Sequence, residues 1–161
     1  MSQFKNRHVL KKKELRAILE DIKTKFNIEI DKKSKIEEAD FEGVKVIIID
    51  DKVDFFVKGE KIFFTLPAIE KYKLRSNKVI VDMGAVKFVS NGADVMAPGI
   101  IKADRNIKAG DSVWVCDEKY NKPLAVGEAL MDGETMENSS SGKAVKTLHY
   151  VGDRIWKICH T

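Results

Sequence analysis

Acidic and imidazole side chains are the residues of this chain whose types are suited to catalysis or metal binding. Asp50, Asp51 and Asp54 form one acidic cluster. A Mg²⁺ site would need further carboxylates from elsewhere in the chain, and a turn already explains this cluster. The three histidines are scattered and lack zinc-site spacing to either cysteine; they are His8, His149 and His160. The residues therefore predict no catalytic site, no metal site and no cofactor.

The motifs of large enzyme families are absent from the 161 residues. The chain contains no Gly-x-Ser-x-Gly elbow, no P-loop and no dinucleotide fingerprint. Its composition, with 43% hydrophobic and 34% charged residues, is that of a folded protein rather than a disordered one. The net charge of +4 is small and permits an anionic partner without demanding one.

The hydropathy of the chain and the contexts of its cysteines indicate in which cellular compartment the protein works. The longest apolar cluster, residues 44–49, is interrupted by Lys45 and is far below the ~20 residues that cross a membrane. The basic N-terminus lacks the apolar stretch of a signal peptide, so we expect a cytoplasmic protein without a membrane partner. Cys116 and Cys159 lie in apolar contexts and are expected to be buried free thiols; a disulfide stays open for a hyperthermophilic source.

Two small domains, residues 1–74 and 75–161, are expected to organise the chain. The first has an α+β pattern, with an amphipathic helix over residues 7–26 and a helix after Pro67. Its β-branched and aromatic runs predict the strands 44–49, 53–57 and 61–65. The polar stretch Arg75 to Lys78 separates it from the second domain.

The second domain reads as a small mixed β-barrel. A strand at residues 79–81 precedes a short helix, residues 83–90, which Asp82 can cap and Gly92 can end. Short strands with Gly and Asp turns follow, as in barrels; we expect them at 95–96, 100–102, 112–116, 124–130, 144–150 and 154–158. The polar stretch 132–142 is expected to be a mobile loop or a frayed helical turn.

Four ordered blocks within residues 79–156 resemble the signature of PUA domains. They are Asp82-x-Gly-Ala followed by Gly92-Ala93 and Pro98-Gly99; Lys108-Ala-Gly110-Asp111; Pro123 to Leu130 with Gly127; and Gly142 to Trp156. The whole chain is similar to stand-alone archaeal proteins that carry a pre-PUA domain before the PUA domain. These resemble the malignant-T-cell-amplified-sequence family and the N-terminal part of ligatin.

The resemblance implies binding of structured RNA, a tRNA acceptor end or ribosomal RNA, in translation initiation or recycling. It also implies the small ribosomal subunit or a translation factor as a partner. PUA-containing modification enzymes carry a separate catalytic domain, and 74 residues cannot hold one. On this reading the protein is not an enzyme.

The residues around the glycine-rich turn have chemistry that suits RNA. Glycines and small residues let backbone amides approach a phosphate or a base edge. Cationic side chains can neutralise phosphates, apolar ones can lie under a terminal base, and aromatic rings can stack. The expected RNA-binding residues are Lys87, Gly92, Ala93, Met96, Ala97, Pro98, Gly99, Ile100, Lys102, Arg105, His149 and Tyr150.

Structural roles remain open for several of these residues. Met96 and Ile100 are compatible with places in the core, and Tyr150 with packing against Trp156. Two other functions also remain open. The protein could be an interaction module with an exposed apolar patch on residues 53–64, around Phe55, Phe56, Phe63 and Phe64. It could also be an accessory subunit of a pseudouridine- or archaeosine-forming enzyme.

Overall fold

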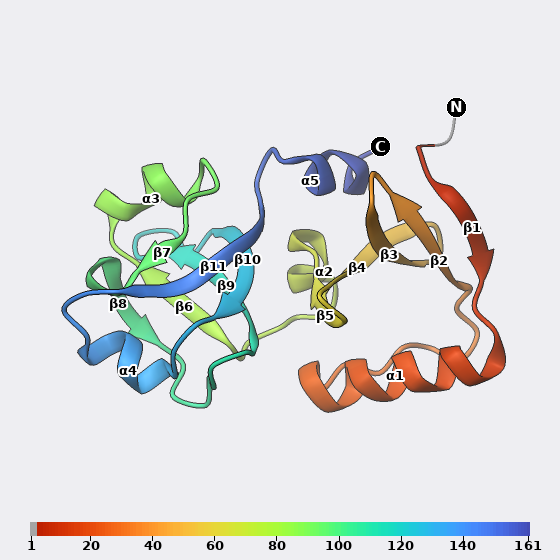
Figure 1. Ribbon diagram of the computed structural model, residues 1–161, viewed down its shortest axis with the longest axis horizontal. Coiled ribbons are helices and arrows are strands. Elements are labelled where there is room, and N and C mark those ends of the chain that lie inside the picture. The colour runs from red at the N-terminus through yellow and green to blue at the C-terminus, as the bar shows by residue number, and fades with distance from the viewer. Residues whose placement is uncertain (1–2) are drawn as a thin grey trace. The chain divides into compact units, whose positions relative to one another are not determined.

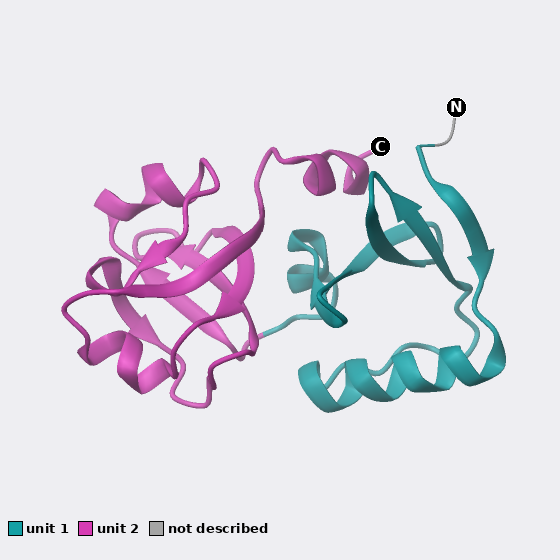
Figure 2. Ribbon diagram, in the orientation of Figure 1, with its two compact units in different colours: residues 1–74 teal, residues 75–161 magenta. Residues whose placement is uncertain are grey.

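The computed structural model describes residues 3–161, and its contacts divide the chain into two units between Leu74 and Arg75 (Figure 2). Unit 1 contains five strands and two helices, in the order drawn in Figure 1. They are β1 (Lys5–Val9), α1 (Lys12–Phe26), β2 (Ile36–Phe41), β3 (Val44–Ile49), β4 (Lys52–Lys58), β5 (Lys61–Phe64) and α2 (Leu66–Lys71). The strands form one antiparallel sheet in sequence order.

Two-residue turns set the register of this sheet. Asp50 and Asp51 join β3 to β4 with φ of 49° and 68°, and Gly59 and Glu60 join β4 to β5 with φ of 56° and 67°. Turns with positive φ at both central residues match the twist of the flanking strands. The prediction that a turn explains the acidic pair is therefore confirmed.

The phenylalanines of the β4–β5 hairpin form the core of unit 1. Phe55 pairs with Phe64 across the strands, Phe56 pairs with Phe63, and all four are at most 2% exposed. Neighbouring residues of a strand point to opposite faces, so both faces of the hairpin are covered. On one face the ring of Phe26 lies 6.1 Å from Phe55 and 5.1 Å from Phe64. The expected exposed patch on residues 53–64 is therefore wrong.

Asp54 ties helix α2 to the sheet. Its carboxylate is buried, and its Oδ2 accepts hydrogen bonds from the Tyr72 hydroxyl at 2.5 Å and from Lys71 Nζ at 2.7 Å. Burial and the hydrogen bond to Asp54 raise the pKa of Tyr72 well above its usual value. Sequence reasoning grouped Asp54 with the turn residues, because only the fold reveals its partners at the end of α2.

Tyr72→Phe is expected to lower the free energy of unfolding by about 1 kcal/mol, because it removes one hydrogen bond to a buried carboxylate. The folded protein holds the phenolic proton more tightly than the unfolded chain does. That contribution is complete below the unfolded pKa near 10 and is lost as the pH rises toward the folded value. Urea unfolding at pH 7 and pH 11 measures both effects. If the free energy of unfolding fell by the same amount in wild type and in Tyr72→Phe from pH 7 to pH 11, this role for Tyr72 would be contradicted.

The N-terminal helix is shorter than predicted. Residues 7–9 belong to strand β1, which pairs with β2, and the helix begins at Lys12. The apolar spacing that predicts the helix starts only at Leu15, so nothing local favoured helix over residues 7–11. Strand β2 was missed because its sequence, Ile-Glu-Glu-Ala-Asp-Phe, is half acidic. Glu37 is nevertheless buried, and its carboxylate accepts two hydrogen bonds from Arg7.

Unit 2 is a nearly closed mixed barrel, as predicted. Its six strands are ordered β7-β11-β10-β9-β6-β8, and all pairs are antiparallel except β6 with β9. The elements are β6 (Lys78–Val81), α3 (Met83–Val89), β7 (Val95–Met96), the 3-10 turn η1 (Ala97–Gly99), β8 (Ile100–Ala103), β9 (Ser112–Asp117), β10 (Pro123–Ala129), α4 (Gly133–Asn138), β11 (Lys143–Tyr150) and α5 (Arg154–Cys159). Small aliphatic side chains such as Val79, Val113 and Ala125 fill its interior.

The structure decides one open alternative in unit 2 and corrects one prediction. Of the loop and the helical turn expected for residues 132–142, the helical one forms, as helix α4 over residues 133–138, and the fully buried Met136 anchors it beside β8. Residues 154–159 form helix α5 rather than a strand. Asp153 caps α5 by accepting a hydrogen bond from the Trp156 amide at 2.7 Å, and Ile155 and Ile158 are buried on one helical face.

Cys116 and Cys159 form no disulfide, and of the two Cys116 is fully buried. Burial raises the pKa of the Cys116 thiol to about 11. Cys159, at the end of α5, is half-buried, so the expectation of burial is wrong for that residue. The Cys116 thiol, whose pKa is this high, is a poor nucleophile at neutral pH.

Candidate nucleic-acid interface

A groove of about 630 Å³ lies between helix α3 and the segment from β7 to η1. Its walls are mainly apolar; the lining residues used below are Phe88, Ala93, Met96, Pro98, Gly99 and Lys143. Phe88 is 62% exposed and Met96 46% exposed. Two large apolar side chains that remain this exposed beside a hollow form a surface suited to a flat, apolar ligand.

Backbone geometry shapes the groove at both ends. Asp82 caps α3 through its side chain, which accepts from the Ala85 amide at 2.8 Å, and its own amide donates to the Gly99 carbonyl. A Cβ on Gly99 would lie 3.1 Å from the Cβ of Ala85. Glycine at this position therefore lets the turn η1 approach the first turn of the helix closely.

Gly92 closes the other end of helix α3 in the left-handed region, with φ of 91°. A Cβ there would lie 2.6 Å from the ring of Tyr150. Gly92 is thus required both for its conformation and for the close approach of that ring.

Four of the predicted RNA-binding residues line the groove together: Ala93, Met96, Pro98 and Gly99. Ala97 and Ile100 are buried in the barrel core, so they cannot contact RNA directly. Lys87 is exposed on α3 but does not line the groove. Met96, Pro98 and Gly99 thus line the groove, whereas Ala97 and Ile100 of the same segment pack into the core.

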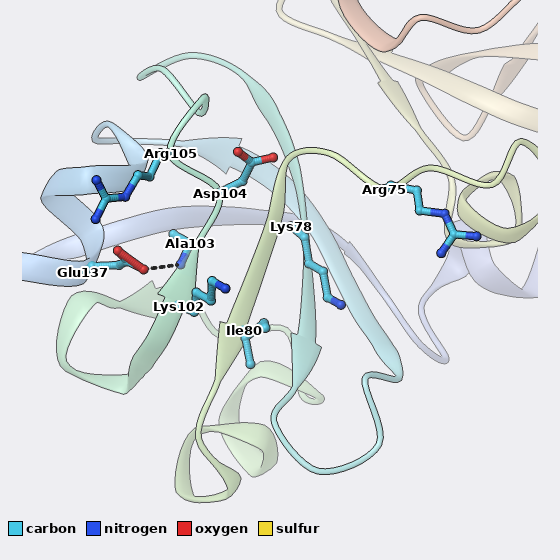
Figure 3. Close-up of a pocket in the computed structure, with 8 residues that line it drawn as sticks. All are labelled: Arg75, Lys78, Ile80, Lys102, Ala103, Asp104, Arg105 and Glu137. Atoms are coloured by element: carbon cyan, nitrogen blue, oxygen red, sulfur yellow. Dashed lines mark hydrogen bonds between the residues drawn. The ribbon is translucent and has the colours of Figure 1, made fainter.

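The other two predicted cations lie in a different place. Lys102 and Arg105 line a second pocket of unit 2, together with Arg75 and Lys78 (Figure 3). The expectation that they surround the glycine-rich turn is therefore wrong. Lys143 is the cation that lines the groove, and its Nζ lies 3.4 Å from an Asp94 carboxylate oxygen.

His149 is fully buried, so the predicted stacking of its ring on RNA is wrong. Its Nδ1 lies 3.0 Å from both carboxylate oxygens of Asp153. Burial opposes ionisation of Asp153, but the contact with His149 and the amides of Trp156 and Tyr150 outweigh it, so its pKa lies below the usual value. Tyr150 is half-buried and packs against the barrel core. His149 and Tyr150 therefore have structural roles: they pack in the barrel, and the Tyr150 ring lies beside Gly92 at the end of α3.

Asp153→Asn is expected to lower the free energy of unfolding by about 1–2 kcal/mol at pH 7, because a charged acceptor for a buried imidazole is lost while a capping oxygen is kept. The folded pKa of Asp153 is depressed. Its contribution is thus present above the unfolded pKa near 3.9 and lost as the pH falls through the folded value. Urea unfolding of both proteins at pH 7 and pH 3 should show a difference that shrinks in acid. A difference that grows in acid would contradict this assignment.

Sequence reasoning missed Phe88 and Lys143. Phe88 had a usable signal, because Val86 and Val89 were placed on the inner face of the helix, which leaves Phe88 on the outer face. No sequence signal pointed to Lys143, because only the pairing of β11 with β7 brings it beside Met96.

Residues 3–161 contain no cluster of histidine, cysteine, aspartate and glutamate that could hold a metal ion. In the same part of the chain, no helix has the length and apolar character needed to cross a membrane.

Comparisons with known proteins match both halves of the chain. Residues 77–151 match the PUA domain, and residues 6–72 match a domain of unknown function, DUF1947. An uncharacterized protein of Methanocaldococcus jannaschii is 44% identical over 96% of this chain and 97% of its own length. Translation machinery-associated protein 20 of Saccharomyces cerevisiae is 31% identical over 79% of this chain and 74% of its own length.

The fold also occurs in a solved structure. The crystal structure of a hypothetical protein from Pyrococcus horikoshii superimposes with a TM-score of 0.83 at 38% identity, covering 95% of this chain and 99% of that one. None of the matched domain descriptions names an enzymatic domain. The chain therefore belongs to the PUA-domain proteins and carries an N-terminal DUF1947 domain, and translation machinery-associated protein 20 is among its relatives.

Proposed function

We propose that this protein is a non-enzymatic RNA-binding component of the translation machinery that holds an unpaired base of a structured RNA in the α3–η1 groove. The observation that carries the proposal is the exposure of Phe88 and Met96 on a groove that Gly99 also lines. Proteins read structured RNA by shape and backbone contacts, and they take exposed bases by stacking on aromatic and apolar side chains.

Different residues of the groove would contact different parts of the RNA. Phe88 and Met96 supply the apolar surface for a base, while Gly99 and Pro98 leave room for it. Lys143 at the rim supplies positive charge for a phosphate, in competition with Asp94. Lys87 on the same helix adds a second exposed cation. The kinship with translation machinery-associated protein 20 supports a place in the translation machinery. Within it, the proposed ligand is a tRNA acceptor end or ribosomal RNA, and the proposed partner is the small ribosomal subunit or a translation factor.

Binding of unmodified tRNA, measured by filter retention over a series of salt concentrations, tests this proposal. We expect binding that weakens steadily with salt, because phosphate contacts release counterions. We also expect an unlabelled tRNA with an intact single-stranded 3′ end to compete with the labelled tRNA for binding. Failure to bind at 50 mM salt, or binding that salt leaves unchanged, would overturn the proposal.

A further inference from the structure

A second pocket of about 670 Å³ lies on unit 2 and shares no lining residue with the α3–η1 groove. We call it the β6–β8 pocket. Its walls come from the start of β6, the end of β8 and helix α4 (Figure 3). The lining residues are Arg75, Lys78, Ile80, Lys102, Ala103, Asp104, Arg105 and Glu137.

The register of the sheet places the side chains of this pocket on one face. Lys78 and Ile80 alternate with the buried Val79 and Val81 along β6, so they share the outer face. Lys102 lies directly opposite Ile80 in the antiparallel pair. Residues opposite each other in such a pair point to the same side of the sheet. Figure 3 shows Lys102 beside Ile80 and Lys78 further along β6.

The two carboxylates of the pocket are already engaged by backbone amides. Glu137 accepts a hydrogen bond from the Ala103 amide at 3.2 Å. Asp104 accepts from the amides of Asn77 at 3.0 Å and Asn106 at 2.9 Å. These carboxylates fix α4 and the ends of the two strands, and they position the pocket walls.

The four cations of the pocket have no such partners. Within residues 3–161, no salt bridge joins Arg75, Lys78, Lys102 or Arg105 to a carboxylate. Lys78 only approaches the Trp114 ring, with Nζ at 5.4 Å from the ring centre. Arg75, Lys102 and Arg105 are exposed to solvent. The pocket is therefore lined by four cations and two carboxylates, and its net charge is positive.

We propose that the β6–β8 pocket binds phosphate groups, and that in the protein's function these are phosphodiesters of the RNA backbone. A guanidinium presents a planar fork that matches phosphate oxygens, and an ammonium adds a point charge. Ile80 offers a small apolar surface for the sugar beside the phosphate. The identity of the RNA rests on the proposed function, whereas the affinity of the pocket for a phosphate anion does not.

The position of this pocket suits contact with an RNA that also occupies the groove. Lys78 lines the pocket at the start of β6, and Asp82, which lines the groove, follows the end of the same strand. Four residues of extended chain separate them by ~13 Å. The pocket would therefore fix the backbone of the RNA while the groove takes an unpaired base, which joins positioning by phosphate to recognition of a base.

The double variant Lys102→Gln/Arg105→Gln tests the proposal, because both side chains are exposed and form no described hydrogen bond or ion pair. We expect tRNA affinity at 0.1 M salt to fall about 10-fold, and the slope of log affinity against log salt to become shallower by about 1.4–1.8. The matched control is Lys108→Gln/Lys122→Gln, which removes the same charge from exposed positions of unit 2 outside both pockets. An equal loss in both double variants would mean that only net charge matters and would overturn the phosphate site.

Titration with inorganic phosphate and with a dinucleoside monophosphate separates this proposal from the proposed function. We expect ¹H–¹⁵N spectra of the full chain to shift at the amides of Asn77, Ala103 and Asn106, and not in Lys102→Gln/Arg105→Gln. Shifts with both probes support a phosphodiester site, even if tRNA fails to bind and the proposed function falls. Shifts with inorganic phosphate alone would reject RNA backbone as the ligand, and shifts with neither would reject the pocket as a phosphate site.

Discussion

Gly127→Ala is expected to lower the free energy of unfolding of the barrel by about 3 kcal/mol. A Cβ at this position would lie 2.2 Å from the Lys146 carbonyl oxygen and 2.9 Å from a methyl carbon of Val145. The oxygen belongs to the backbone of β11, which pairs with β10 on either side of an irregularity at Val126 and Gly127. It cannot retreat without separating two central strands. Thermal unfolding followed by circular dichroism measures the effect.

Gly152→Ala is the matched control for this substitution. Gly152 also lies in unit 2, but nothing stands within 4 Å of the position that its Cβ would take. Its φ of 90° alone should cost about 1 kcal/mol. We therefore expect a clearly larger fall in melting temperature for Gly127→Ala. Equal falls would show that the close approach of the two strands at Gly127 costs no more than the positive φ of Gly152, and would contradict the expected steric penalty.

Phe88→Ala/Met96→Ala is expected to weaken RNA binding by about 10- to 100-fold, since base stacking on an aromatic side chain contributes about 1–3 kcal/mol. Both side chains are largely exposed, so their removal should leave the stability of the barrel nearly unchanged. The salt dependence should also stay the same, because neither residue contacts a phosphate. Fluorescence anisotropy with labelled tRNA at three salt concentrations gives both quantities.

Ile101→Ala supplies the control for this double variant. Ile101 is 52% exposed on β8 and lines neither the groove nor the β6–β8 pocket. It should bind tRNA as the wild type does. If Ile101→Ala weakened binding as much as Phe88→Ala/Met96→Ala, the effect would come from general loss of apolar surface, and the groove would lose its assignment.

The barrel could be predicted because its local signals agree with its topology. The Asp82 cap, the glycine that ends α3 and the short strands bounded by turns all appear in the sequence and in the structure. The sequence did not predict the secondary structure of segments that are held by pairing or packing with residues far along the chain. Strand β2 is half acidic and is held by pairing with β3 and β1. The sequence left α4 open between a loop and a helical turn, and the burial of Met136 decides for the helix.

The candidate site could be predicted only in part, for a related reason. Adjacent residues of the glycine-rich segment were treated as one surface, whereas Met96 and Pro98 face the groove while Ala97 and Ile100 face the core. Lys102 is close to this segment in sequence, yet it lines a different pocket. Sequence distance does not reveal which face of a strand a side chain occupies until the register is known.

The most direct test of the central claim compares two RNAs with the same duplex, one blunt and one with an unpaired 3′ end, in anisotropy titrations against the wild-type protein. If the groove holds an unpaired base, the RNA with the unpaired end should bind about 10-fold more tightly, and Phe88→Ala/Met96→Ala should abolish that difference. Equal affinity of the wild-type protein for both RNAs would contradict the claim that the groove receives a base.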